Sequence, residues 1–147
     1  MRPTFNHFGN PVRAAGILVK CDGYTLLRRV NWRYEDMGGK TDEMDACAMD
    51  TAIREAVEET NGKLFSARDT RQQCARRLAC LLPHCDTHYN PRSKYLCYIL
   101  HVPVYVRHKP MQRFGLHEAT EWGLLPHYYQ WKRYFPRNLH PRLRLLR

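Results

Sequence analysis

The sequence contains no apolar stretch that approaches the roughly 20 residues a helix needs to cross a bilayer. Its first residues, Met1 to Thr4, also lack the apolar core of a secretion signal. Internal repeats, low-complexity tracts and linker-like segments are absent as well, which favours a single domain over residues 1–147. We therefore expect a soluble protein with no membrane partner, placed by default in the cytoplasm or nucleus. A secretion leader removed earlier would leave no trace in this sequence.

Acidic residues are few relative to basic ones. The chain has 14 Asp and Glu residues against 24 Lys and Arg residues, which gives a formal net charge of +10 at pH 7. Such an excess favours an anionic partner or substrate and carries no information about the fold. A solubilising basic surface would explain the charge equally well, so the charge alone does not decide between these explanations.

The six cysteines include no CxxC pair. Three of them lie near two histidines, but the spacing matches no common pattern of zinc ligands. The residues concerned are Cys74, Cys80, Cys85, His84 and His88. An even number of cysteines would permit disulfides in an oxidising compartment. Cys47 and Cys97, however, lie in segments with apolar patterning that is typical of small buried hydrophobic residues, so we expect reduced thiols.

Apolar patterning predicts several strands and one clear helix. The predicted strands cover residues 14–20, 24–30 and 94–106, with a short strand beginning at 64–65. The turn at Cys21-Asp22-Gly23 would join the first two strands as a hairpin. Pro103 indicates an edge strand or a bulge.

The predicted helix covers residues 49–60, where apolar residues recur at the i, i+3, i+4 and i+7 spacing of one helix face. Asp45 or Asp50 would cap its start. Asn61 and Gly62 would end it, because both residues tolerate the left-handed conformation.

The other segments carry weaker patterns. Residues 67–80 are compatible with a helix or a loop, residues 107–126 with a loop anchored by Trp122, and residues 127–135 with a short helix. A basic tail from about residue 136 has spaced leucines that would pack on the domain or on another subunit. The order of elements predicts an α/β (α+β) sandwich, in which helices pack on a mixed sheet.

Three glutamates on the predicted helix form the clearest chemical feature. Glu55, Glu58 and Glu59 have the i, i+3 and i+4 spacing, so their carboxylates meet on one side of the helix. Three like charges at that spacing repel one another, and a divalent cation such as Mg²⁺ would offset the repulsion. The alternative is an ordinary solvated helix face that is rich in glutamate.

The stretch around these glutamates carries further pattern. Residues 38–63 have the sequence GGKTDEMDACAMDTAIREAVEETNGK, a double glycine followed by an acidic loop and a REAVEE core. This stretch resembles the Nudix box, a loop–helix–loop motif written Gly-x5-Glu-x7-Arg-Glu-U-x-Glu-Glu-x-Gly-U, where U is a bulky apolar residue. The resemblance covers about a sixth of the chain, and the predicted strand order is compatible with a Nudix fold elsewhere.

The stretch departs from the motif in its loop and at the end of its helix. Asp45 stands where the motif has its upstream Glu, with Glu43 as the other candidate for that role. Eight residues, rather than seven, separate Asp45 from Arg54. Ala56 replaces the bulky apolar residue, and Asn61 stands where the closing glycine belongs.

The resemblance implies roles for individual residues. Glu55, Glu58 and Glu59 would be ligands of Mg²⁺ or Mn²⁺, with the Gly39 carbonyl as an extra ligand. Arg54 would hold the box together through a contact with a carboxylate. Water would attack a phosphorus atom of a diphosphate linked to another group, while the metal lowers the pKa of that water and neutralises charge on the phosphates.

The general base is left open by the resemblance. The candidates are Glu59, Glu118 and Glu121, in that order. The last two lie in the segment that we expect to be a loop, where an ordinary polar surface would carry such residues equally well.

The substrate is less determined than the reaction. The candidate substrate-binding residues are Lys20, Arg28, Arg29, Trp32 and Lys40. Arginine suits phosphate groups and aromatic rings suit bases, so a densely anionic substrate is favoured, with capped RNA first and a diphosphoinositol polyphosphate second. The alternatives are a small nucleotide such as ADP-ribose, a dinucleotide polyphosphate or a dNTP. A catalytically inactive Nudix-fold module that binds phosphorylated ligands, or a basic RNA-binding protein whose glutamates are incidental, also stays open.

Overall fold

The computed structural model describes residues 1–107, 111–120 and 123–146; for residues 111–120 and 123–127 it describes the strands but not the side chains. The strands are β1 (Phe5–His7), β2 (Asn10–Val12), β3 (Ala14–Cys21), β4 (Tyr24–Val30), β5 (Arg33–Glu35), β6 (Met37–Lys40), β7 (Asp86–Asn90), β8 (Tyr95–His101), β9 (Met111–Thr120) and β10 (Gly123–Lys132). The α-helices are α1 (Ala48–Thr60) and α2 (Arg71–Leu81), and the 3-10 turns are η1 (Leu82–His84), η2 (Val104–Val106) and η3 (Pro141–Leu146).

One mixed sheet organises the molecule. Among the described residues it has eight strands, with a main order of β7-β8-β3-β4-β10-β9, while β6 pairs with β3 and β5 pairs with β4. The β3–β8 pairing is parallel and the others are antiparallel. Strands β1 and β2 form a separate hairpin. The predicted α+β architecture, with helices packed on a mixed sheet, is confirmed.

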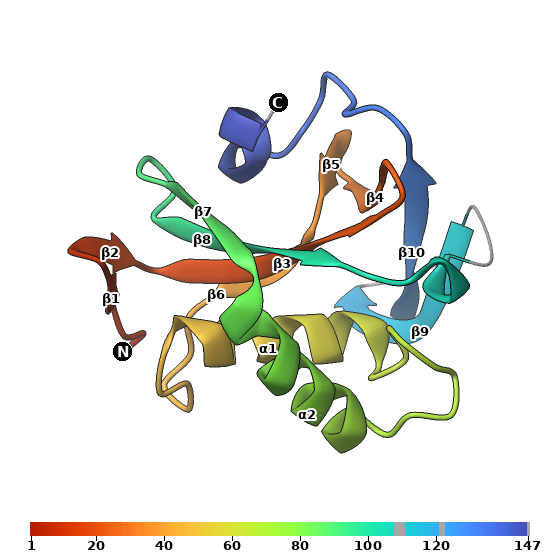
Figure 1. Ribbon diagram of the computed structural model, residues 1–147, viewed down its shortest axis with the longest axis horizontal. Helices are drawn as coiled ribbons and strands as arrows, with labels where there is room; N and C mark the ends of the chain where they lie inside the picture. The colour runs from red at the N-terminus through yellow and green to blue at the C-terminus, as the bar shows by residue number, and fades with distance from the viewer. Residues whose placement is uncertain (108–110, 121–122, 147) are drawn as a thin grey trace.

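The two faces of the sheet are covered by different layers (Figure 1). Helix α1 packs on β3 and β6, and α2 packs on α1. On this side Ile17 and Val19 belong to the main core. The chain's C-terminal segment crosses the opposite face, where Leu18 and Leu27 bury against Leu139 and Leu143. The alternation along β3 therefore supplies both cores, as a strand buried on two faces requires.

The predicted helix and first hairpin are present, but two details of the helix prediction are wrong. Helix α1 ends at Asn61, whose φ of 52° lies in the left-handed region as expected. Its N-cap is Cys47, which makes no side-chain capping bond. Asp45 does not cap the helix, because its carboxylate accepts hydrogen bonds from Thr51 and Arg54 instead. Cys47 is also exposed rather than buried, whereas Cys97 is buried as predicted.

The basic segment after α1 contains a helix. Thr70 and Gln73 form a capping box in which each side chain accepts a hydrogen bond from the other residue's backbone, and α2 follows. The short strand predicted at Leu64 is wrong. Leu64 and Phe65 bury in the main core without pairing to a strand, so their apolar character reflects packing and not sheet formation.

Two predictions near the C-terminus are also wrong. The predicted loop over 107–126 and the predicted helix over 127–135 are largely occupied by the paired strands β9 and β10. Tyr129 and Trp131 are buried while Tyr128 is exposed, which is the alternation of a strand. Pro126 fits in β10 because the register shifts on both sides of it. Trp122 lies outside the described residues.

The remaining expectations concern Pro103, the thiols and the membrane. Strand β8 is paired on both sides and ends at His101, so Pro103 marks neither an edge nor a bulge but follows the end of the strand. All six cysteines are free. None of the helices in the described ranges has the length and apolar character that crossing a membrane requires.

Candidate functional site

The three glutamates of α1 lie in different surroundings. Glu59 is 5% exposed, whereas the side chain of Glu58 is 50% exposed and that of Glu55 is mostly covered. The reason is the position of α1 on β3 and β6, which places part of the glutamate face against the sheet. The glutamate face is therefore partly buried, unlike an ordinary solvated face.

Strand β6 brings the double glycine against this helix. A Cβ atom on Gly39 would collide with the Glu55 carboxylate. The carboxylate thus rests directly on the Gly39 backbone, in a space that only glycine leaves open. The loop and helix halves of the motif are in contact at this point.

Glu59 is held at one carboxylate oxygen. Its Oε1 accepts a hydrogen bond of 3.1 Å from the Tyr129 hydroxyl and lies 3.1 Å from Arg28 Nη2. Its Oε2 is buried and has no hydrogen-bond partner among the residues that the structure describes. Burial raises the pKa of Glu59 to about 8, although the charge of Arg28 opposes the rise. A buried carboxylate with one unpartnered oxygen is an incomplete arrangement, since such groups are normally paired.

Arg28 connects this carboxylate to a second one. Its Nη2 lies 2.8 Å from Glu35 Oε1 in addition to its contact with Glu59. The Arg28 side chain is 12% exposed. Arg28 is the one predicted substrate-binding residue whose side chain contacts an α1 glutamate, and in this arrangement it is an ion-pair partner.

Arg54 ties the acidic loop to the helix. It donates to both oxygens of Asp45, at 3.0 and 3.1 Å, and to the Lys40 carbonyl at 2.9 Å. It also lies 3.1 Å from Glu55 and 3.6 Å from Glu58. The contact between Arg54 and a carboxylate that the resemblance implies is therefore present. Its partner is the shorter Asp45 on a loop with one extra residue.

Asp45 and Glu43 have separate partners. Burial alone would raise the pKa of Asp45, but hydrogen bonds from Arg54 and Thr51 lower it. Glu43 is exposed and pairs with the N-terminal amine of Met1. Asp45 therefore anchors the loop through Arg54 and Thr51, whereas Glu43 is paired with the N-terminal amine.

A second buried ion pair supports β6 from the other face of the sheet, and the sequence analysis missed it. Arg142 contacts Asp36 at 2.7 Å, and the Tyr95 hydroxyl donates to Asp36 at 2.6 Å. Asp36 is fully buried, two residues before the double glycine. Gly16 and Gly38 give space to the Tyr95 hydroxyl, since a Cβ atom on either glycine would collide with it. The one available signal was the position of Asp36 between Glu35 and apolar Met37, just before the double glycine.

The other predicted substrate-binding residues do not join the α1 site. Lys20 lies over the ring of Phe135, at 5.2 Å, and Arg29 lies over the ring of Trp32, at 4.6 Å. Lys40 contributes its carbonyl to Arg54, and its side chain is exposed. Strand alternation separates Arg28 from Arg29, because adjacent residues of β4 point to opposite faces.

The two remaining base candidates have no described side chain. Glu118 lies in β9, in register with Leu125 of β10, and β9 contacts α1. Glu121 lies outside the described residues. Their predicted role as general bases therefore stays a prediction.

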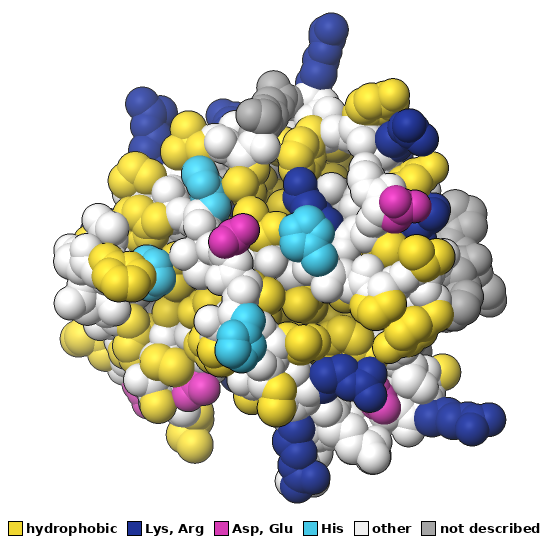
Figure 2. Space-filling view, in the orientation of Figure 1, with side chains coloured by type: hydrophobic (Ala, Val, Ile, Leu, Met, Phe, Trp, Pro, Cys, Tyr) yellow, Lys and Arg dark blue, Asp and Glu magenta, His cyan; other side chains and the backbone are white. Residues whose placement is uncertain are grey.

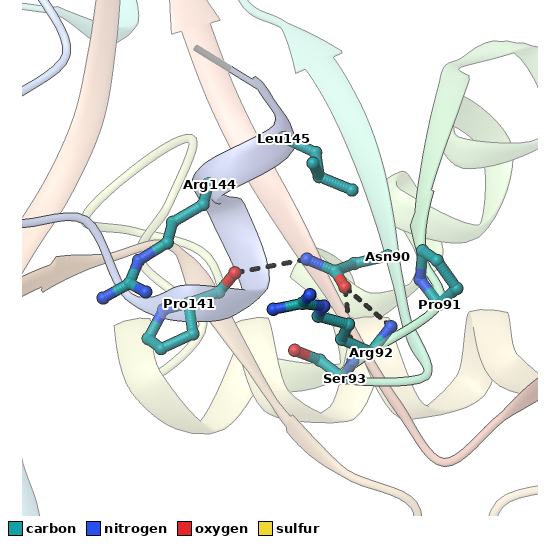
Figure 3. A pocket seen from close by; sticks show the side chains of 7 residues that line it. All are labelled: Asn90, Pro91, Arg92, Ser93, Pro141, Arg144 and Leu145. Atoms are coloured by element: carbon teal, nitrogen blue, oxygen red, sulfur yellow. Dashed lines mark hydrogen bonds between the residues drawn. The ribbon is translucent and has the colours of Figure 1, made fainter.

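Two hollows border these elements. One, of about 410 Å³, runs along α1 beside Arg54, Glu58 and Arg71, and is open to solvent. The other, of about 310 Å³, lies between the β7–β8 turn and the C-terminal segment (Figure 3). There Asn90 donates to the Pro141 carbonyl at 3.2 Å. The second hollow belongs to the seam that docks the C-terminal segment.

The fit of a divalent cation is mixed. Within the described part of the chain, no three His, Cys, Asp or Glu side chains are arranged to hold a metal ion. Arg54 occupies Glu55 and Glu58, and Arg28 occupies one oxygen of Glu59. The unpartnered Glu59 Oε2 and the contact of Glu55 with the Gly39 backbone nevertheless provide the oxygen donors that Mg²⁺ and Mn²⁺ prefer.

Comparisons with known proteins add no identification. No family model matches the chain, and no curated protein matches its sequence.

Proposed function

We propose that the protein is a metal-dependent pyrophosphohydrolase of the Nudix type, which hydrolyses a diphosphate linked to another group. The observation that carries the proposal is the buried Glu59, whose Oε2 has no partner among the described residues. Glu55, one helical turn away, rests on the Gly39 backbone. A solvated helix face would not bury a carboxylate and leave one of its oxygens without a hydrogen bond, because an unsatisfied buried polar atom is costly.

Glu55, Glu58, Glu59 and the Gly39 carbonyl would hold Mg²⁺ or Mn²⁺. The bound cation would lower the pKa of a water molecule and neutralise charge on the substrate phosphates. Arg54 keeps the loop that follows Gly39 fixed against α1 through its bonds to Asp45 and Lys40.

Glu59 is also the first candidate for the general base. Arg28 and Tyr129 hold its Oε1, so the carboxylate keeps one orientation, and Oε2 has no partner among the described residues. If Oε2 takes the proton of the attacking water, the metal would be held by Glu55, Glu58 and the Gly39 carbonyl instead. Without a bound metal, burial raises the pKa of Glu59 to about 8, so this carboxylate takes up a proton near neutral pH, and a base works best when its pKa is close to the working pH.

The proposed substrates are densely anionic diphosphates, with capped RNA first and a diphosphoinositol polyphosphate second. The net charge of +10 supports this order, since ADP-ribose, dinucleotide polyphosphates and dNTPs need less positive charge. The partner of the site is thus a phosphorylated and strongly anionic molecule.

The test is a phosphate-release screen of these five substrate types with Mg²⁺ or Mn²⁺. Glu59→Gln is compared with wild type and with Glu43→Gln, an equal change at an exposed residue outside the site. We expect Glu59→Gln to lower turnover more than about 100-fold, since loss of even an outer-shell partner costs up to that factor. Near-normal turnover by Glu59→Gln would exclude the mechanism.

A second candidate function is an inactive module that binds phosphorylated ligands. The pairing of Arg54 and Arg28 with the glutamates favours it, as does the absence of a metal-ready cluster in the described residues. Absence of turnover on every substrate, together with tight ligand binding that needs no metal, would support this candidate over the hydrolase.

A further inference from the structure

The turn between β4 and β5 holds an exposed tryptophan in an unusual backbone conformation. The turn has two central residues, Asn31 and Trp32, with φ values of 48° and 69°. Such turns favour Asn followed by Gly, because a side chain at positive φ is strained. Trp32 is nevertheless 77% exposed, so neither backbone geometry nor core packing explains a large aromatic residue here. Strain of this kind is a reason to look for function.

Cations and aromatic rings alternate across the surface next to this turn. We call this surface the basic–aromatic face; its residues are Lys20, Arg29, Trp32, Tyr34, Lys132 and Phe135. In addition to the Lys20–Phe135 and Arg29–Trp32 stacks, Lys132 lies 4.9 Å from the centre of the Tyr34 ring.

Strand register places these residues side by side. Lys20 pairs with Thr25, and Thr25 pairs with Lys132, so the two lysines flank one position on β4. Arg29 pairs with Tyr34 across the β4–β5 hairpin. Arg29 and Leu27 are two residues apart in β4, so their side chains point to the same face of the sheet. Leu27 packs against the C-terminal segment, so this face is the one opposite to α1.

In the part of the chain that the structure describes, Lys20, Arg29 and Lys132 make no ion pair with a carboxylate. The nearby acids Glu35 and Asp36 are buried and bound to arginines. In the view of Figure 2, hydrophobic and His side chains fill much of the surface, and most Lys and Arg side chains lie toward its edge.

An open hollow adjoins the tryptophan. It has a volume of about 430 Å³ and is lined by Arg29, Asn31 and Trp32. An exposed indole beside a guanidinium and an amide matches the chemistry that binds a nucleobase, which stacks on the ring and accepts polar contacts at its edge. Cations spaced around such a ring match the phosphates of a continuing strand.

We propose that the basic–aromatic face binds single-stranded nucleic acid. An unpaired base stacks on Trp32, and the phosphates on either side of it contact Arg29, Lys132 and Lys20. The proposal does not depend on the proposed hydrolase, because these residues lie on the sheet face opposite to α1 and need no metal.

The test measures binding of a fluorescently labelled 12-nucleotide oligo(U) RNA, and the same length of oligo(dT) DNA, by anisotropy in EDTA. Trp32→Gly removes the ring and gives the turn the residue its backbone favours, so the variant folds. Phe8→Gly is the matched control, because Phe8 is also an aromatic residue in a two-residue turn, with a φ of 49° and 92% exposure. Phe8 lies in the β1–β2 hairpin, outside the basic–aromatic face.

We expect Trp32→Gly to weaken binding about tenfold, within the range of one stacked base, and Phe8→Gly to bind like wild type. Equal affinities of Trp32→Gly and Phe8→Gly would overturn the proposal. So would equal binding of a 12-base-pair duplex, because a duplex does not offer an unpaired base. Absence of binding to either oligonucleotide at 50 mM salt would point to a protein partner instead and would likewise overturn it.

The phosphate contacts have their own readout. Replacing Lys20, Arg29 and Lys132 together by Gln should flatten the slope of log affinity against log salt by about 2, at roughly 0.7 per lost phosphate contact. Replacing three exposed arginines outside this face, Arg68, Arg76 and Arg92, should leave the slope unchanged. If both triple variants flattened the slope by a similar amount, the effect would come from net charge, and the assignment of RNA binding to the basic–aromatic face would be wrong. Glu59→Gln should bind RNA normally, so failure of this proposal and failure of the hydrolase are separate results.

Discussion

At the scale of single residues, Gly39 and Gly16 differ in what an added side chain would contact. A Cβ atom on Gly39 would collide only with the end of the flexible Glu55 side chain. A Cβ atom on Gly16 would collide with the Tyr95 hydroxyl and also with the Met37 backbone carbonyl, which is fixed in the sheet. The same substitution should therefore affect function at one position and folding at the other.

We predict that Gly39→Ala folds, with a loss of about 1–3 kcal/mol in stability, and loses most of the proposed turnover because Glu55 is displaced. Gly16→Ala should cost more than about 4 kcal/mol, the range of changes that disrupt the backbone or core. Urea unfolding followed by circular dichroism, with turnover on the best substrate of the screen, measures both. A Gly39→Ala variant with full turnover would mean that Glu55 does not act from its present position.

The residues of the candidate site were only partly predictable. The spacing of Glu55, Glu58 and Glu59 identified the helix face, because helix periodicity is a local property. Their unequal burial was not predictable, since it depends on how α1 lies against a sheet formed by distant residues. The partners of Glu59 come from β4 and β10, and no local pattern connects Arg28 and Tyr129 to a glutamate in α1.

At the scale of elements, a half-buried histidine helps to dock the C-terminal segment. The His140 backbone N–H donates to the Tyr34 carbonyl, and its Nδ1 accepts from the Arg142 N–H at 3.2 Å. Burial lowers the pKa of His140 and the charge of Arg142 lowers it further, whereas Glu35 and Asp36 oppose the shift. Arg33 also acts to lower it. Protonation removes the acceptor and adds a positive charge beside Arg142.

We predict that the free energy of unfolding decreases as the pH is lowered below 6.5, the ordinary pKa of histidine. The folded-state pKa of His140 is below its ordinary value of 6.5, so its contribution is complete above that pH and is lost as the pH falls through the folded pKa. Urea unfolding at pH 7.5 and pH 5.5 should show a smaller loss for His140→Gln than for wild type. His84→Gln, at an exposed position of η1, should behave like wild type. An identical pH dependence in all three proteins would remove His140 from the docking of this segment.

The elements that were predicted wrongly share a cause. The segment at 127–135 is rich in aromatic residues, which suit either a strand or a buried helix over so short a length. Tyr129 and Trp131 are buried because β10 lies between β4 and β9 in the sheet. Pairing with β4 is a contact between distant parts of the chain, so tertiary context and not local propensity decided the structure. The hairpin of β3 and β4 was predictable because its turn and alternation are local.

At the scale of the whole molecule, the C-terminal segment is a structural layer of the domain and not an appended basic tail. Leu139 and Leu143 are nearly fully buried against the sheet face opposite to α1. Asn90 also holds the segment, by donating to the carbonyls of Pro141 and Arg142. Removal of residues 136–147 would expose apolar surface and leave Asp36 without its arginine, so such a truncation tests folding and not substrate binding.

The buried pair of Arg142 and Asp36 connects this layer to the strand that carries the double glycine. Loss of the pair should therefore lower the stability of the whole domain. We predict that Arg142→Met costs about 3–5 kcal/mol in stability, because Asp36 is fully buried and would keep an uncompensated charge. The double variant Asp36→Asn with Arg142→Met should recover much of that loss, since neither charge remains. Urea unfolding at neutral pH gives the coupling between the two residues as a double-mutant cycle. If the two substitutions were simply additive, the pair would not act as a unit, and the C-terminal layer would be held by its leucines, Asn90 and the backbone hydrogen bonds with Tyr34.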